Sequence, residues 1–402
     1  MDVAGATWTR ASDSGRTVVG GVAALVALAA LAGCATGDAR TVAEPVPHGR
    51  VAGAEETAEA RLRLVLADAA AGDVHLLDLI TGETTRIATG VTDVGRIRTD
   101  GRRAYLTTRD GKATRVIDGG AWTVDHGDHV HHYRTTPRDL GTTPGTGHLL
   151  DRARLDEGEL RPLGDGVAVR GGAAVRDGVP VRDRVAVPYR DRLLVPGDGL
   201  VRVWEPGGAP AGVIAEPCPD QEGEALTPRG AVFGCADGVL LVTGTARGLD
   251  GVKIPYPDEG LRVRRFGHRP GGTVLAAPAE RRTGHQSAGA GVWALDVTRR
   301  SWTRLRTGPV TAVTAAGDGA PVLALSPDGA LRSFDHRSGR ELGRTDLLEE
   351  TSGAVIEVDT GRAYVNDPAG RAVHEIDYRD GLRRARTFRL GFTPGHMVET
   401  GR

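Results

Sequence analysis

Four of the twelve histidines in this 402-residue chain fall within seven residues, from His126 to His132. Asp125 and Asp128 are interleaved with them. Neutral imidazole is the commonest protein ligand for divalent metals of intermediate softness, and zinc sites combine histidine nitrogen with carboxylate oxygen. The spacing matches neither a helical His-Glu-x-x-His site nor a Cys-x-x-Cys site. The residue types therefore predict a metal site whose ligand spacing differs from both of these motifs.

The spacing of the histidines indicates how they would converge on one ion. If residues 128–133 are extended, His129 and His131 lie on one strand face, about 7 Å apart along the chain. His126 lies beyond Gly127, which can turn the backbone and bring His126 in as a third ligand. We therefore expect these three histidines to bind one metal ion. The alternative is a polar loop in which histidines cluster without a ligand.

The N-terminal segment has the pattern of a secretory signal. Two arginines precede an unbroken run of small apolar residues over 18–32, followed by Leu-Ala-Gly-Cys ending at Cys34. The run is short and rich in Ala and Gly for a membrane-spanning helix. Leu-Ala-Gly-Cys resembles the bacterial lipobox, in which the cysteine is lipidated and becomes the first mature residue. We expect a signal peptide over 1–33 and a lipid anchor at Cys34 on the outer face of the bacterial membrane; the alternative is a plain signal peptide.

Two further cysteines remain once Cys34 is set aside, namely Cys218 and Cys235. In an oxidising compartment an even pair is interpreted as a disulfide. Closing a loop of this size contributes roughly 3 kcal/mol in the chain-entropy model. The alternative is two buried free thiols.

The net charge and the sequence motifs limit the classes of function that the chain could have. The 51 basic and 52 acidic residues give a formal net charge of −1, which provides no electrostatic case for a nucleic-acid partner. The chain has no Gly-x-Ser-x-Gly elbow, P-loop or dinucleotide fingerprint, so we expect no enzymatic activity. A zinc hydrolase that uses Asp125 or Asp128 as its acid or base is the alternative.

The rest of the chain reads as a repeat of short β-type runs and Gly-rich turns. One unit, an alternating apolar run ending in aspartate and a turn, recurs at intervals of 39 to 42 residues in its closely spaced copies. A period near 40 with several strands per unit predicts an all-β propeller of seven or eight blades, and eight fits the length slightly better. A β-sandwich is the alternative. We expect a flexible tether over 34–61, a propeller over 62–402 and a monomer. The aspartates of the repeat are Asp78, Asp118, Asp296, Asp335 and Asp377.

Four stretches of the chain, in this order, resemble the zinc metallochaperones of Azt-type zinc ABC importers. They are the histidine segment at 125–134, the Cys-Pro to Gly-Cys-Ala-Asp-Gly segment at 218–241, Ile-Pro-Tyr-Pro at 254–257 with Gly-His at 267–268, and 361–368. The resemblance implies a secreted β-propeller that binds Zn²⁺ and passes it to the solute-binding protein of the importer.

The resemblance carries over residue by residue. His126, His129, His131 and Asp128 match the histidine pattern of the family, whereas His132 stands where an aromatic residue is expected. A family histidine between Cys-Pro and Gly-Glu-Ala is replaced here by Glu222, which can also ligate zinc. The candidates for a fourth ligand or for a partner of a ligand are Asp128, His148, Glu222 and His268.

Overall fold

The computed structural model describes residues 51–68, 70–126, 128–144, 187–205, 210–246, 248–283 and 286–402, and the backbone of four short strands between 162 and 185. The predicted signal peptide, Cys34 and His148 lie outside the described residues. All described residues belong to one compact unit, Gly49–Arg402. The described part of the chain contains strands and no helix, so no helix there is long and apolar enough to cross a membrane.

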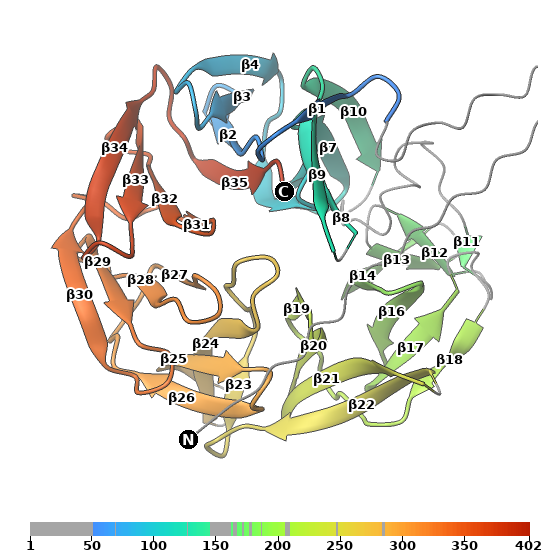
Figure 1. The fold of residues 1–402 in the computed structure, drawn as a ribbon. Helices are drawn as coiled ribbons and strands as arrows, with labels where there is room; N and C mark the ends of the chain where they lie inside the picture. Colours follow the sequence, from blue (N-terminus) through green and yellow to red (C-terminus); the bar gives the residue numbers. More distant parts are fainter. Residues whose placement is uncertain are drawn as a thin grey trace, which may run out of the picture. The chain divides into compact units, whose positions relative to one another are not determined.

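Eight antiparallel four-stranded sheets make up most of the described structure (Figure 1). This arrangement confirms the all-β prediction and fits a propeller-like fold. The first four sheets are formed by β35 (His396–Thr400), β2 (Arg63–Asp68), β3 (Asp73–Asp78) and β4 (Thr84–Ala88); by β5 (Val94–Thr99), β6 (Arg103–Thr108), β7 (Ala113–Asp118) and β10 (Arg138–Pro144); by β11 (Pro162–Leu163), β12 (Val167–Arg170), β13 (Ala173–Arg176) and β14 (Val179–Val185); and by β15 (Val187–Tyr189), β16 (Arg192–Gly197), β17 (Leu200–Trp204) and β18 (Pro210–Ile214).

The other four sheets follow in chain order. They are formed by β19 (Glu224–Thr227), β20 (Gly230–Cys235), β21 (Gly238–Thr245) and β22 (Gly248–Pro255); by β23 (Leu261–Val263), β24 (Val274–Thr283), β25 (Gln286–Asp296) and β26 (Ser301–Leu305); by β27 (Ala312–Ala315), β28 (Val322–Leu325), β29 (Ala330–Phe334) and β30 (Glu341–Asp346); and by β31 (Ile356–Val358), β32 (Arg362–Asp367), β33 (Ala372–Asp377) and β34 (Arg383–Arg389).

The repeated aspartate has a local structural cause. It ends or follows the third strand of its sheet, where its carboxylate accepts hydrogen bonds from backbone N–H groups of the next turn. Asp78 Oδ1 accepts from the N–H groups of Ile80 and Thr81 at 3.0 and 3.1 Å. Asp335 Oδ1 accepts from the N–H of Ser338 at 2.7 Å in the same way. Aspartate is favoured at such turns because its short side chain satisfies these donors, so the 40-residue interval marks one sheet to the next.

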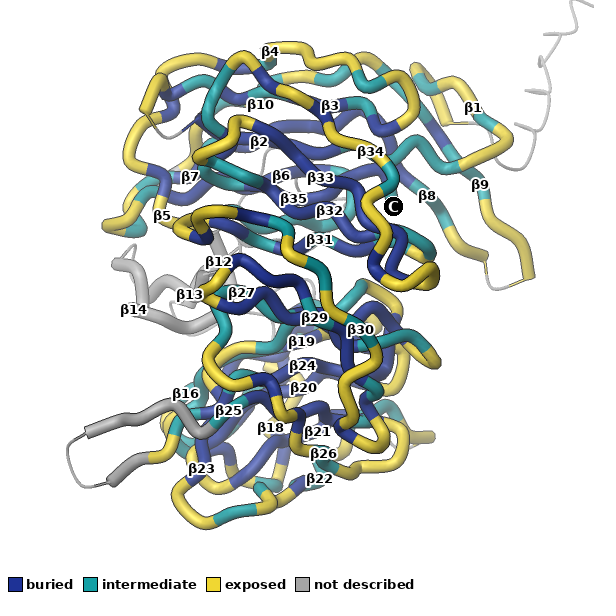
Figure 2. Tube along the Cα trace, turned by 90° about the vertical axis from the view of Figure 1, so that its left-hand side faces the viewer, coloured by how far each residue is buried: buried dark blue, intermediate teal, exposed yellow. Residues whose placement is uncertain are grey.

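Neighbouring sheets bury their apolar faces against each other. Leu325 and Leu331 of one sheet share a cluster with Val365 and Ile376 of the next, and all four side chains are fully buried. Figure 2 shows the same distribution, with buried strand centres and exposed turns. Removal of this apolar surface from water is the main stabilising contribution to the fold.

The last strand joins the first sheet. β35 pairs antiparallel with β2, from Arg63 opposite Thr400 to Ala67 opposite His396. The sheet at the start of the unit is therefore completed by residues more than 300 positions later in the chain, which a local pattern does not predict.

Candidate metal centre

The histidine segment forms a hairpin inserted into the second sheet. β7 pairs with β10, and the chain between them forms β8 (Ala121–Asp125) and β9 (Val130–Arg134). This inserted hairpin forms a separate three-stranded sheet with β1 (Glu55–Thr57), in the order β1-β9-β8. The turn between β8 and β9 is exposed where it is described (Figure 2).

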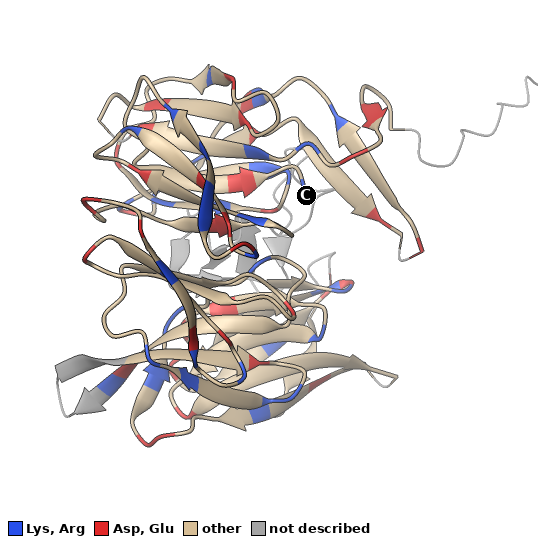
Figure 3. Cartoon of the chain, turned by 60° about the vertical axis from the view of Figure 1, so that its left-hand side comes forward, with Lys and Arg blue, Asp and Glu red and all other residues tan. Residues whose placement is uncertain are grey.

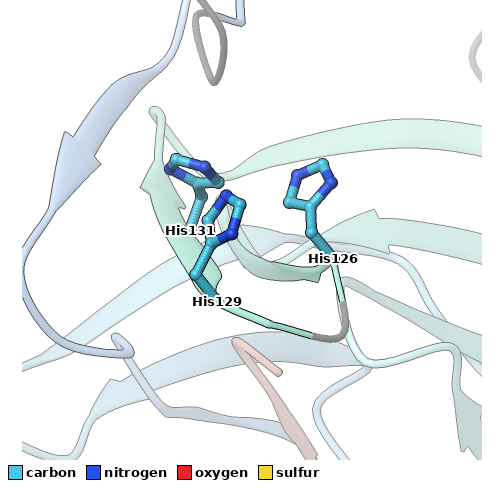
Figure 4. Close-up of side chains that lie close together, drawn as sticks. All are labelled: His126, His129 and His131. Carbon is cyan, nitrogen blue, oxygen red and sulfur yellow. The ribbon is translucent and has the colours of Figure 1, made fainter.

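Three histidines meet at this turn. His126 follows β8, His129 precedes β9 and His131 lies on β9; we call them the histidine triad. Their ring centroids are 4.9 to 5.3 Å apart, and one nitrogen from each lies within 4.8 Å of the other two. Figure 4 shows the three rings gathered on one side of the hairpin. The backbone N–H of His126 donates to the carbonyl of His129 at 2.9 Å, which closes the turn.

The histidine triad fits a zinc ion after a small movement. Zinc–nitrogen bonds of about 2.0–2.1 Å place the ligand nitrogens of a tetrahedral site about 3.4 Å apart. Because His126 and His129 are exposed, their side chains can rotate inward to reach this separation without repacking a core. Three protein ligands also leave a fourth coordination position for water or for an incoming group.

Two carboxylates contact the histidine triad. Asp128 Oδ1 lies 2.7 Å from Nδ1 of His129, and Glu56 Oε1 lies 2.7 Å from Nδ1 of His131. An ionised carboxylate only accepts hydrogen bonds, so each Nδ1 must donate, which leaves the lone pair of Nε2 for a metal. Of the two roles expected for Asp128, ligand or partner of a ligand, this contact corresponds to the second.

Glu56 is a residue that the sequence did not predict for the site. It lies on β1, where the expected tether would be, and it is opposite Tyr133 of β9. On the same strand, Glu55 accepts two hydrogen bonds from Arg134, at 2.8 and 2.9 Å. Figure 3 shows acidic and basic residues mixed over the strands and turns of the chain. No local signal marks Glu55 and Glu56, because a strand of three residues has no periodicity and its partner strand begins 73 residues later.

His132 has a different environment, as the alternation of a strand predicts. Its Nδ1 lies 2.9 Å from the hydroxyl of Thr123 on β8. This residue is not part of the histidine triad.

Among the described residues, the group of potential metal ligands consists of the histidine triad and includes neither Glu222 nor His268, which have other partners. Glu222 accepts a hydrogen bond from Arg264 at 2.5 Å and lies 3.6 Å from Nε of Arg262. Nε2 of His268 donates to the carbonyl of Leu226 at 3.2 Å, and burial lowers the pKa of this histidine. Both residues belong to connections around the fifth and sixth sheets, whereas the triad belongs to an insertion in the second. Nothing in the described residues tests His148.

Cys218 and Cys235 form a disulfide, as their pairing in the sequence predicts. Both residues are buried, and the N–H of Cys218 donates to the carbonyl of Gly199 at 2.7 Å. The bond fastens the chain entering the fifth sheet to the end of β20. A buried disulfide is consistent with an extracytoplasmic, oxidising compartment.

The sheets and the histidine triad together define an all-β, propeller-like protein with an exposed group of potential metal ligands. Its structure is similar to that of AztD from Citrobacter koseri. For apo AztD the TM-score is 0.64 and the identity 18%, over 85% of this chain and 98% of that chain. A second AztD structure gives 0.63 and 17%, over 86% and 99%.

A more distant similarity is to the dihydro-heme d1 dehydrogenase NirN, with a TM-score of 0.50 and 15% identity over 84% of this chain and 75% of that chain. No family model and no curated protein matches the sequence. At these identities the structural similarity shows an AztD-like fold, and ligands and partners do not follow from it.

Proposed function

We propose that this chain is an extracytoplasmic zinc metallochaperone that delivers zinc to the solute-binding protein of a zinc ABC importer. The observation that carries the proposal is the convergence of three imidazoles on an exposed hairpin turn of an AztD-like fold. The motifs shared with the Azt-type metallochaperones support the same function.

The geometry suits a carrier because a carrier must hold the ion and then give it up. Three imidazoles supply neutral nitrogen ligands, and the two carboxylates hydrogen-bonded to them strengthen their basicity. Exposure of the turn allows a ligand of the solute-binding protein to enter the fourth position before a histidine leaves. Transfer then proceeds by stepwise ligand exchange, and no free ion needs to form. We propose no catalytic step for this site.

The second candidate function is a metal-free lipoprotein that acts as a binding scaffold. One observation favours it: Glu222, at the position where the family carries a histidine, is paired with Arg264 and Arg262. The two guanidinium groups compensate the carboxylate and repel a divalent cation. In this alternative the histidine triad binds no ion.

Metal analysis of the purified mature protein decides between the two functions. We expect about one zinc per chain after expression with ample zinc, and none in a variant with all three triad histidines replaced by alanine. Because imidazole also binds copper well, the same titration is run with both metals. For delivery, the zinc-loaded protein is mixed with the zinc-free solute-binding protein and the two are separated again. Transfer faster than the loss of zinc to a chelator supports a chaperone, and a wild-type protein without metal supports the scaffold.

The proposed anchor is tested separately. Cys34→Ala removes the only thiol that a lipobox would lipidate, so we expect the protein to leave the membrane fraction and enter the medium. The disulfide should form equally in both proteins, which controls for export. Unchanged membrane partition of the variant would contradict a lipid anchor.

A further inference from the structure

β1 is a short edge strand with few attachments. It pairs over three residues with β9, and the Glu55–Arg134 pair holds it from the side. The side chains of Glu55 and Glu56 are 63% and 54% exposed. A strand with so little buried surface detaches at low free-energy cost while the sheets beside it stay folded.

The two carboxylates that contact the histidine triad differ in origin. Asp128 belongs to the inserted hairpin and adjoins His129 in sequence. Glu56 is 75 residues away from His131 in sequence and reaches it only because β1 is docked. Detachment of β1 would therefore remove the carboxylate from His131 and leave the hairpin itself intact.

We infer that Glu56 is a positioning residue and that β1 is a strap that sets how tightly the histidine triad holds its ion. This inference rests on the proposed function. With β1 docked, the carboxylate of Glu56 fixes the His131 ring and directs its Nε2 toward the ion. With β1 detached, the ring loses this partner and the ion is held less tightly. Linkage requires the reverse effect as well: a bound ion stabilises the docked strand by the same factor.

The position of β1 in the chain suggests how the coupling between strand docking and zinc affinity could serve zinc delivery. β1 is the first strand of the described structure, and it follows the segment that leads from the predicted anchor at Cys34. A partner strand that replaces β1 at the edge of β9 would lower the affinity of the site at the moment of delivery. The partner chemistry required is an extended segment that offers backbone N–H and C=O groups.

The test compares two conservative variants of β1 in the full mature chain. Glu56→Gln removes the carboxylate beside His131 and retains the shape of the side chain. Glu55→Gln is the matched comparison: it keeps the carboxylate beside His131 and removes only the exposed ion pair with Arg134, which contributes little to the docking of β1. In competitive zinc titrations we expect Glu56→Gln to lower the affinity about 10- to 100-fold. Glu55→Gln should change it much less.

Two further measurements detect what a merely structural role would not change. Histidine ¹⁵N spectra of the zinc-loaded wild type should show His131 bound through Nε2 with a proton on Nδ1, and Glu56→Gln should alter the Nδ1–H signal. Zinc should slow amide hydrogen exchange at residues 55–57 of the wild type by about the factor that Glu56→Gln costs in affinity. This slowing should be lost in Glu56→Gln.

The outcomes separate this inference from the proposed function. A wild type that binds no zinc overturns both. The strap is overturned, and the proposed zinc carrier is not, if the wild type binds zinc, the two variants bind it with equal affinity, and zinc does not change hydrogen exchange at 55–57. Equal weakening by both variants overturns the specific role of Glu56.

Discussion

The inserted β8–β9 hairpin and the β19–β20 hairpin both lie in stretches singled out by the sequence analysis, yet their polar side chains have opposite environments. On the inserted hairpin, the histidine triad is at an exposed turn and contacts carboxylates. Around β19–β20, the cysteines are buried in a disulfide, and Glu222 contacts guanidinium groups. The first region offers negative charge and neutral nitrogen ligands to a cation. In the second region the charges compensate each other and the cysteines form a structural cross-link.

The difference shows that residue type alone does not make a ligand. A carboxylate beside an imidazole increases the capacity of that imidazole to bind a cation. A carboxylate beside two arginines is already neutralised, so a cation gains little there. The predictions that follow test this contrast, beginning with the largest expected effect.

The first prediction concerns the histidine triad itself. His129→Ala and His131→Ala each remove one of three ligands, so zinc affinity should fall by more than the roughly 10- to 100-fold cost of losing an outer partner. His132→Ala is the control, because its ring contacts Thr123. Competitive titration measures all three. If His132→Ala loses zinc while the other two variants keep it, the strand geometry is wrong.

The second prediction concerns the Cys218–Cys235 disulfide. A double Cys218→Ala, Cys235→Ala variant should lose about 3 kcal/mol of stability, because the cross-link closes a loop spanning 17 residues. Its zinc affinity should remain that of the wild type, since the triad is on another sheet. Denaturant melts and zinc titrations check the two halves. A parallel loss of zinc binding would show that the two regions are coupled.

The third prediction concerns the pH dependence of the stability of the sheets, which we expect to depend on a residue outside the inserted hairpin. Burial, with help from Glu399 and against the effect of Arg402, raises the pKa of Glu357 to about 7 from its ordinary 4.5. The folded state then binds more protons than the unfolded state between these values, so stability should fall as the pH rises from about 4.5 to about 7.

Glu357→Gln should remove this dependence and raise the melting temperature at pH 8 by roughly 5 °C, with little change at pH 4.5. Thermal melts of the zinc-free protein across this range measure it. Parallel pH curves for the wild type and the variant would show that Glu357 titrates normally.

The smallest effect is expected at Glu222. Glu222→Gln breaks a partly exposed ion pair with Arg264, which contributes at most about 1 kcal/mol. Zinc affinity should not change. A clear drop in zinc affinity would show that Glu222 contributes to zinc binding, and the contrast between the two hairpins would then be wrong.

The features of this protein that depend on neighbouring residues could be predicted from the sequence. The aspartates at the turns, such as Asp78, recur because each satisfies nearby backbone N–H groups, so the repeat and the sheets follow from local chemistry. The triad is also local: a strand face and a turn bring His126, His129 and His131 together. The cysteine pair follows from the number of cysteines and the expected compartment.

Contacts between residues that are distant in the sequence could not be predicted in this way. The pairing of β1 with β9 brings Glu56 to His131, and the pairing of β35 with β2 completes the first sheet. The same packing places Glu222 beside Arg264 and the ring of His268 beside the backbone carbonyl of Leu226. Such contacts depend on which strand edges lie side by side. That choice is made by the free energy of the whole packed chain, and a short strand such as β1 carries no pattern that reveals its partner.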